Sequence, residues 1–174
     1  MSNFIDFKRG EHTCDDIGMS NGMTAVFISI LALSGTKLAA TENQKRLMVR
    51  LCEADQICGI GTVSFDVCSL PWERETLEED KAFMLRVIEG AKNKTGWEKL
   101  DYEPSEERLF PNLDKLIRLI ERVTAADIDD EKIKKWYELA EADDPINNGF
   151  PKCEKHGVFL TCLGCVVCND PYMQ

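Results

Sequence analysis

Five side chains of types that commonly bind metal ions are concentrated near the end of the sequence: Cys153, His156, Cys162, Cys165 and Cys168. Thiolate sulfur and imidazole nitrogen are preferred zinc ligands, and ligand pairs separated by two residues are typical of structural zinc sites. A structural zinc ion is held by four protein ligands, whereas a catalytic zinc ion keeps one position for water. Five candidates for four positions favour a structural site, so the sequence predicts a closed zinc centre.

The first ligand pair is followed by a residue that suits a tight metal-binding turn. Cys153 and His156 are separated by two residues, and Gly157 comes directly after them. Glycine adopts a left-handed backbone conformation without steric cost, which lets the chain turn and point amide hydrogens at the first thiolate. We therefore expect a compact turn at residues 153–157, which we call the first knuckle.

The spacing leaves the second ligand pair open. Cys162 and Cys165 are separated by two residues, and so are Cys165 and Cys168. The second alternative has Asn169 where a left-handed residue is wanted, and asparagine tolerates that conformation better than most residues. We slightly favour Cys165 and Cys168, with Cys162 kept as a candidate.

The order of these motifs resembles a zinc ribbon or a related zinc-knuckle module. Cys-x-x-His-Gly is followed by a short hydrophobic strand, Val158 to Leu160, and then by Cys-x-x-Cys. The resemblance covers only residues 151–170 and implies a metal-stapled hairpin rather than a biochemical activity. A fifth ligand candidate departs from the usual pattern. Residues 1–150 show no family resemblance.

Two alternatives to a metal site concern the cysteines themselves. Reduced cysteines pack as small hydrophobic residues, and His156 would then be an ordinary surface side chain. Disulfides are the other alternative, but residues 1–10 lack the basic start, apolar middle and cleavage site of a secretory signal. Because the reducing cytosol favours thiols and metal thiolates, we expect a cytoplasmic protein with a metal-bound tail.

The length of 174 residues, with 44% hydrophobic and 30% charged residues, is typical of one globular domain. We predict an acidic, mainly helical domain over residues 1–150 and a zinc-binding tail over residues 151–174. The expected fold class is mainly α: about five helices, one short strand region and a small C-terminal zinc-knuckle hairpin.

Apolar residues at helical spacing predict the helices at about residues 20–34, 41–54, 76–94, 111–123 and 129–140. Ser34 and Gly35 are expected to end the first helix. Capping boxes that begin at Thr41 and Thr76 are expected to start the second and third. Pro111 suits the first position of the fourth helix, since proline lacks the amide hydrogen that is unpaired there.

The alternation of Val63, Phe65 and Val67 with polar residues predicts a half-buried strand. Residues 94–110 are expected to form a long loop that carries Trp97 and Tyr102. These aromatic side chains could form a partner-binding edge, or they could pack under the loop as a small satellite core. We favour the satellite core.

The formal net charge of −10 limits the kinds of partner. An acidic surface repels phosphate backbones and anionic membranes over about one Debye length, so we expect neither nucleic acid nor membrane binding. The apolar run from Met23 to Leu33 is also too short to span a bilayer. A basic protein partner fits the charge better. The oligomeric state is not indicated.

Known catalytic motifs are missing. His12 is followed by Thr13 and Cys14, which does not match the His-x-Glu of zinc deaminases. A hydrolase that uses a histidine base would have to rely on His12, because His156 is assigned to the metal. His12 and Cys14 would matter for the metal only if they folded back onto the tail.

Three hypotheses follow. The first is a small, acidic, cytoplasmic, zinc-containing binding protein that captures a basic protein partner and is immunity- or antitoxin-like by physical type. The second is a zinc-dependent hydrolase with water on the metal. The third, a regulatory or nucleic-acid zinc module, needs a local basic patch, and the tail offers only Lys152, Lys155 and His156.

Overall fold

The computed structural model describes residues 2–56 and 64–168. This part of the chain contains five α-helices: α1 (Asn21–Leu38), α2 (Glu42–Gln56), α3 (Leu77–Lys92), α4 (Glu106–Arg122) and α5 (Asp130–Leu139). It also contains three strands: β1 (Ser2–Asp6), β2 (Ile17–Ser20) and β3 (Ser64–Asp66). Three single-turn 3₁₀ helices complete it: η1 (Val67–Ser69), η2 (Trp97–Lys99) and η3 (Pro145–Asn147). The predicted mainly helical class is therefore confirmed.

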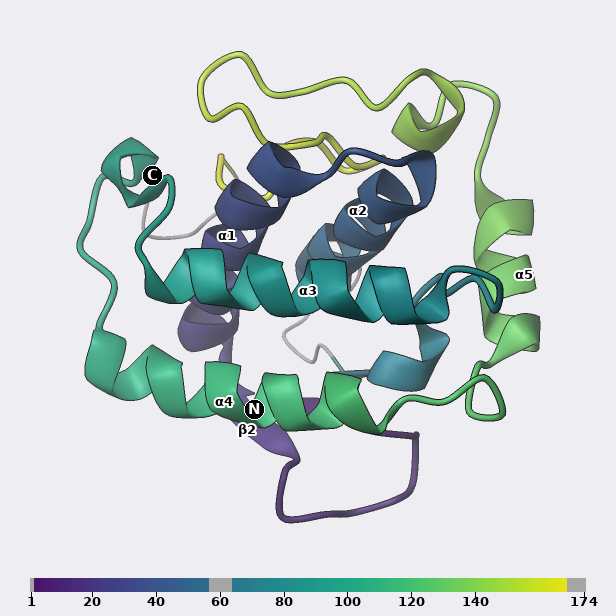
Figure 1. The fold of residues 1–174 in the computed structure, drawn as a ribbon. Coiled ribbons are helices and arrows are strands. Elements are labelled where there is room, and N and C mark those ends of the chain that lie inside the picture. The colour runs from purple at the N-terminus through teal and green to yellow at the C-terminus, as the bar shows by residue number, and fades with distance from the viewer. Residues whose placement is uncertain (1, 57–63, 169–174) are drawn as a thin grey trace.

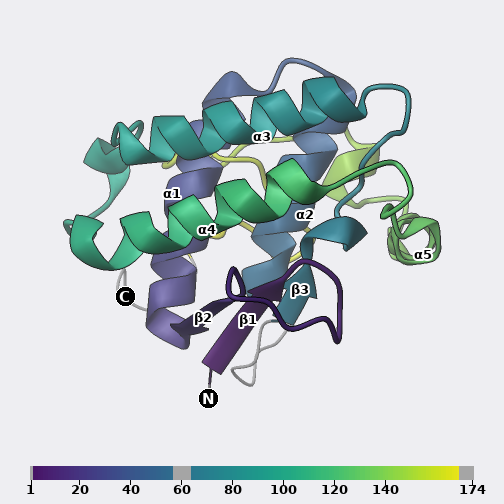
Figure 2. The ribbon, with the colours of Figure 1, turned by 60° about the horizontal axis from the view of Figure 1, so that its bottom comes forward.

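The helix α1 lies at the centre of the molecule. Figures 1 and 2 show α3 and α4 side by side as one layer, with α1 and α2 behind them and the tail across the far end of α1 and α2. By length and composition α1 is apolar enough to cross a membrane, but 67% of it is buried inside the protein. Ile28, Ile30 and Leu31 are fully buried, as expected of a core helix.

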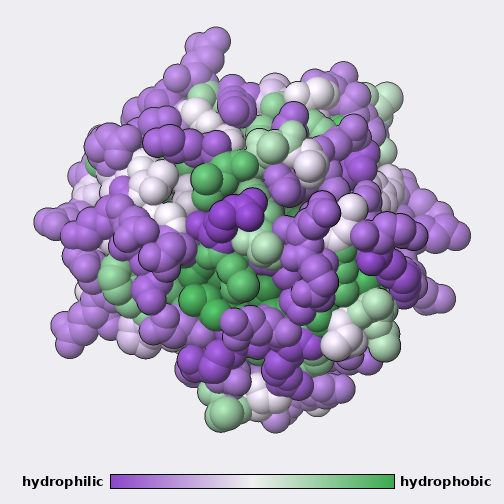
Figure 3. All heavy atoms as spheres, in the orientation of Figure 1, coloured by the Kyte–Doolittle hydropathy of each residue, from purple (hydrophilic) through white to green (hydrophobic). Residues whose placement is uncertain are grey.

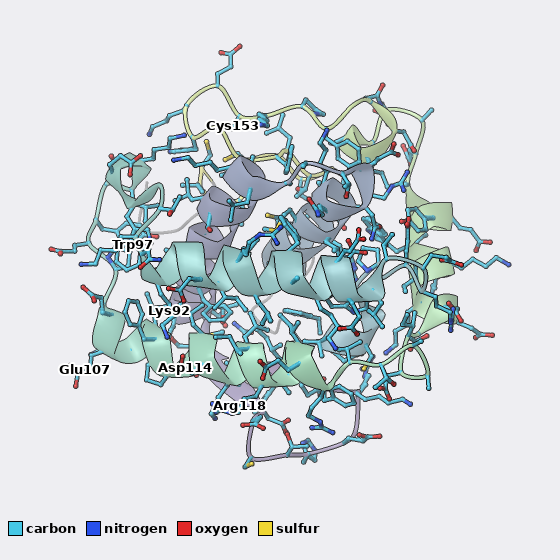
Figure 4. All side chains as sticks on the ribbon, viewed as in Figure 1. Lys92, Trp97, Glu107, Asp114, Arg118 and Cys153 are labelled. Carbon is cyan, nitrogen blue, oxygen red and sulfur yellow. The ribbon has the colours of Figure 1, made fainter. Side chains whose placement is uncertain are left out.

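The outer layer presents a largely polar face. Figure 3 shows hydrophilic side chains over most of this face, with apolar side chains visible between α3 and α4. The two helices are joined at their edge by an ion pair in which Lys92 Nζ lies 2.7 Å from Asp114 Oδ1 (Figure 4). Such an exposed pair contributes little stability. The apolar contacts beneath it therefore hold the layer together.

The small sheet is larger than expected. Its strand order is β2-β1-β3, with β1 antiparallel to β2 and parallel to β3. The sequence predicted one strand, over Val63, Phe65 and Val67: Phe65 lies in β3, Val67 lies in η1, and Val63 is outside the described residues. The strands β1 and β2 were not predicted. Ile5 pairs with both Ile17 and Phe65, and all three side chains are buried. Pairing with β3 therefore stabilises a first strand whose local pattern is weak.

Gly35 does not end the first helix, which continues to Leu38. A Cβ atom on Gly35 would lie 2.3 Å from Met48 Sδ, inside van der Waals contact. The glycine therefore permits close packing of α1 on α2 rather than termination. As a result, Thr36 and Lys37 are placed on the last turn of α1.

The predicted capping boxes have different outcomes. At α2, Thr41 Oγ1 accepts a hydrogen bond from the Gln44 amide at 3.2 Å, and Gln44 Oε1 accepts one from the Thr41 amide at 3.3 Å. This reciprocal pair confirms the prediction. At α3, Thr76 makes no capping bond, and its hydroxyl donates instead to Asp80 Oδ2 at 2.9 Å. The buried carboxylate has taken the hydroxyl that was expected to cap the helix.

The fourth helix begins earlier than predicted. Pro111 lies inside α4 rather than at its first position, so that prediction was wrong. Ser105 precedes the helix, and Glu106 and Glu107 occupy its first turn, where acidic side chains complement the helix dipole. The expected long loop is consequently shorter and contains η2. Trp97 is buried, as the satellite-core interpretation requires.

The tail packs against the helical body. Val158, Phe159, Val166 and Val167 are all buried within the same hydrophobic core as the helices. The amide of Phe159 donates to Thr36 Oγ1 on α1 at 3.2 Å. Two isolated antiparallel bridges occur in the tail, but regular strands are not described there, so the expected hairpin remains a prediction.

Candidate metal centre

Four of the predicted ligands come together in the tail. One ligand atom from each of Cys153, His156, Cys165 and Cys168 lies within 4.8 Å of the other three. The Nδ1 atom of His156 is 3.8 Å from the Cys153 sulfur, 3.6 Å from the Cys165 sulfur and 3.3 Å from the Cys168 sulfur. The sulfurs of Cys153 and Cys168 are 3.8 Å apart. A cluster of this kind could bind a metal ion.

The first knuckle has the predicted backbone. Gly157 is left-handed, with φ of 68°, and its amide donates to the Cys153 carbonyl at 2.7 Å. The Cys153 amide in turn donates to the Val158 carbonyl at 2.8 Å. These bonds hold Cys153 and His156 on one side of the turn. Figure 4 shows Cys153 beside the C-terminal end of α1.

The second knuckle is formed by residues 165–168. The Cys168 amide points at the Cys165 sulfur at a distance of 3.5 Å, which is the arrangement expected of a metal-binding turn. Gly164, just before the knuckle, is left-handed, with φ of 95°, and its amide donates to the Thr161 carbonyl at 2.9 Å. The expected left-handed residue Asn169 lies outside the described residues.

The protonation of the cluster is set by burial and by the knuckle amides. Burial opposes ionisation of Cys153, but the backbone amides of His156 and Lys155 donate to its sulfur, and the net effect lowers the pKa of this thiol. Burial raises the pKa of Cys165 to about 12 and also raises the pKa of Cys168. A metal ion must therefore displace protons from buried thiols, and its binding releases protons.

His156 is prepared to act as a neutral ligand. Its side chain is 1% exposed, and burial lowers its pKa, so the imidazole is uncharged at neutral pH. Nδ1 faces the three sulfurs, and Nε2 has no hydrogen-bond partner among the described residues. Nδ1 is therefore the nitrogen that could bind the metal, and Nε2 would carry the hydrogen.

Cys162 lies apart from this cluster. It is exposed, and its sulfur is grouped with carboxylate oxygens of Glu53 and Asp144. Burial and these two carboxylates raise the pKa of Cys162. Glu53 is already engaged, since its Oε2 accepts a hydrogen bond from the Trp136 indole at 2.7 Å. The structure thus brings four of the five predicted ligands together and places the fifth elsewhere.

His12 and Cys14 do not reach the tail. They lie in the connection between β1 and β2, at the opposite side of the molecule from the tail (Figure 1). His12 is exposed, and its Nδ1 is 3.4 Å from Asp16 Oδ2. His12 is therefore a surface residue, and neither His12 nor Cys14 belongs to the cluster.

Two residues that support the cluster could not be found from the sequence. Lys99, on η2, donates from Nζ to the His156 carbonyl at 2.9 Å. Thr36, on α1, accepts the Phe159 amide. Their partners are 57 and 123 residues away along the chain, and neither residue belongs to a motif. Only the packing of the tail against the body makes these contacts.

The fold and site define a mainly helical protein with a Cys₃His cluster that could bind a metal ion. Comparisons with protein-family models, with curated proteins and with solved structures found no match to this chain. The function must therefore be inferred from the site and from the charge of the chain.

Proposed function

We propose that this protein is a non-enzymatic binding protein in which a structural zinc ion fastens the tail to a helical body. The observation that supports this proposal most strongly is the set of distances between the ligand atoms of the Cys₃His cluster. Tetrahedral zinc with its usual bond lengths requires about 3.8 Å between sulfurs and about 3.6 Å between sulfur and nitrogen. The corresponding distances here are 3.8 Å for Cys153 and Cys168, and 3.3 to 3.8 Å from the sulfurs to His156 Nδ1.

The donor set argues for a structural role. Three thiolates and one imidazole would complete a tetrahedral shell and leave no position for water. Within the described residues, no carboxylate belongs to the cluster, so a hydrolytic reaction would lack a general base at the metal. The zinc-dependent hydrolase is therefore the weaker alternative. It would require one of the four side chains to leave the metal.

A metal is needed because the tail has too little core to fold alone. Among its described residues, Val158, Phe159, Val166 and Val167 pack on the helices, but the first and second knuckles are turns without regular secondary structure. In small zinc peptides the metal contributes on the order of 10 kcal/mol or more to folding. Zinc would thus set the shape of residues 153–168 and hold their apolar side chains against α1.

Zinc binding is tested with matched cysteine variants. Purified protein should contain one zinc per chain by elemental analysis. Substitution of a residue that only supports a metal ligand weakens metal binding by about 10- to 100-fold. Cys165 is itself a proposed ligand, so Cys165→Ser should weaken zinc binding by more than about 100-fold. Cys162→Ser, in the same tail, should bind zinc as the wild type does. Equal loss in both variants, or zinc-free protein, would refute the assignment.

The net charge of the chain is the basis on which we propose a basic protein partner. A chain with formal net charge −10 attracts basic proteins over about one Debye length, which favours an immunity- or antitoxin-like role in capturing a basic protein. Co-purification would identify the partner. Its association rate, measured by surface plasmon resonance, should fall steeply between low and high salt. A rate that does not change with salt would contradict electrostatic capture.

A further inference from the structure

A basic cavity lies beside the first knuckle. It has a volume of about 300 Å³ and lies between the end of α1, η2 and the tail. Three lysines from three separate segments line it: Lys37, Lys99 and Lys152. Glu98 is the only acidic residue among the lining residues. The chain as a whole has 21 basic and 31 acidic residues, so this local excess of positive charge is the reverse of the average.

The lysines of this cavity are not neutralised by neighbours. Within the described residues, none of the three has a carboxylate oxygen within 4.0 Å of its Nζ. Lys99 is held in place by its bond to the His156 carbonyl, and Lys152 Nζ lies 5.2 Å from the centre of the Phe159 ring. Two of the three ammonium groups are therefore positioned by uncharged partners, which leaves their charge available.

His156 adds a second feature to the cavity wall. It lines the cavity, and its Nε2 is buried with no partner among the described residues. Metal ligation through Nδ1 would fix a hydrogen on Nε2, and ligating histidines almost always donate this hydrogen to an acceptor. Nδ1 is the ring nitrogen that lies beside the sulfurs, so the unpartnered Nε2 is on the other side of the ring. The missing partner is thus an acceptor on the side away from the metal.

We propose that this cavity binds a small phosphate group, either free phosphate or a phosphate monoester. Three ammonium groups match the several acceptor oxygens and the negative charge of phosphate, and the buried N–H of His156 belongs to a residue of the same cavity wall. The inference rests on the proposed zinc site only for the hydrogen on Nε2. It differs from nucleic-acid binding, because a single cavity of this size receives one phosphate rather than a backbone.

The lysines also have a simpler possible role. Three thiolates and Zn²⁺ carry a net charge of −1, and nearby ammonium groups would offset it without any ligand. The two roles differ in measurable ways. Charge compensation alone predicts that loss of a lysine weakens zinc binding and that phosphate does not bind saturably. Phosphate binding predicts a saturable site that depends on the lysines while zinc stays bound.

The test uses zinc-loaded full-length protein titrated with inorganic phosphate at constant ionic strength. Calorimetry should give a saturable site, and the His156 Nε2 signal in nuclear magnetic resonance should shift along the same curve. Lys37→Gln and Lys152→Gln should each weaken phosphate binding by roughly tenfold, the effect of one charge-assisted hydrogen bond. The matched control is Lys134→Gln, on α5, whose side chain is 76% exposed and does not line the cavity.

Each outcome decides one point. Non-saturable binding, or equal weakening by all three variants, would overturn the phosphate site. Acetate that bound as tightly as phosphate would overturn the ligand class. Zinc content is measured on the same samples, so protein without zinc would refute the proposed function. Protein that contains zinc but does not bind phosphate would refute only this inference.

Discussion

Thr36→Val tests whether the body of the protein holds the tail in place. The hydroxyl of Thr36 accepts the Phe159 amide at 3.2 Å, and the two residues are 4% and 2% exposed. Valine has nearly the same shape and a similar helix propensity, so neither a cavity nor a change in α1 is expected. The substitution leaves one buried N–H group without an acceptor.

The magnitude follows from this unpaired group. A buried donor that loses its partner costs about 1–3 kcal/mol. The bond is at the long end of the normal range, so the lower half of that interval, about 1–2 kcal/mol, is expected. In urea unfolding with excess zinc, the midpoint should fall while the slope stays constant, because the surface exposed on unfolding is unchanged.

Hydrogen exchange separates the hydrogen bond from general destabilisation. In Thr36→Val the Phe159 amide should exchange roughly 5- to 30-fold faster, which corresponds to about 1–2 kcal/mol. The control is Thr36→Ser, which lacks a methyl group and loses about 1 kcal/mol of burial but keeps the acceptor. Its Phe159 amide should remain more protected than in the valine variant. Equal stability and equal Phe159 exchange in wild type and Thr36→Val would refute the docking of the tail on α1.

Three further predictions concern the body. Gly35→Ala should be destabilising by about 1–2 kcal/mol in urea unfolding despite its better helix propensity, because overpacking against Met48 outweighs the gain, and Met48→Ala should relieve part of this loss in a double-mutant cycle. Burial raises the pKa of Asp80 in the folded protein above its ordinary value of 3.8. The folded state therefore holds this proton more tightly than the unfolded state, and the free energy of unfolding falls as pH rises from 3.8 through the raised pKa. Asp80→Asn should lack this loss and give a flatter pH profile of urea midpoints. Lys132→Met removes the ammonium group 2.6 Å from the buried Asp66 carboxylate, and thermal unfolding should show a loss of about 1–2 kcal/mol, since the lysine is partly exposed.

Local sequence signals were sufficient to predict features whose backbone hydrogen bonds are made by residues close together in the chain. Thr41 and Gln44 cap α2 with each other, so four consecutive residues contain all the information. Asp129 likewise caps α5 by accepting the Lys132 amide at 3.1 Å. The glycine of the first knuckle is a similar case, because its left-handed conformation follows from residue type. These features need no contact with distant parts of the chain.

Tertiary contacts explain the errors in the fold. Glycine usually indicates a helix end, but Gly35 continues α1 because Met48 of α2 occupies the space of its missing side chain. The strand β1 is central only because β3, some sixty residues away, pairs with Ile5 and its neighbours. Residue spacing carries no information about either partner. Both errors therefore arise from packing rather than from the local pattern.

In the candidate site, too, residue spacing predicted the local features, and tertiary contacts decided the rest. Spacing gave five candidate ligands, and four of them lie together in the structure. Cys162 and Cys165 have the same separation as Cys165 and Cys168, so the sequence could only rank the pairs. The turn closed by Thr161 and Gly164 directs Cys162 away from the other sulfurs and toward Glu53. Which cysteine lies outside the cluster thus depends on the turn at residues 161–164 and on the position of α2.

The distribution of charge links the two proposals. The basic cavity beside the metal centre would repel a basic protein, so the proposed capture of a basic partner would need another region of the surface. One candidate region is the cavity of about 320 Å³ where α2 and α3 begin, which is lined by Glu42, Glu73, Glu79 and Asp80 with Arg46. Some of these carboxylates complement helix dipoles, which offsets part of their charge. Arg46 is paired with both Glu42 and Glu73, and the net negative charge that is left would orient the proposed basic partner toward this end of α2 and α3 and away from the lysines of the tail cavity. Salt should therefore weaken phosphate binding and partner binding independently, because the two ligands of opposite charge would occupy regions of opposite charge.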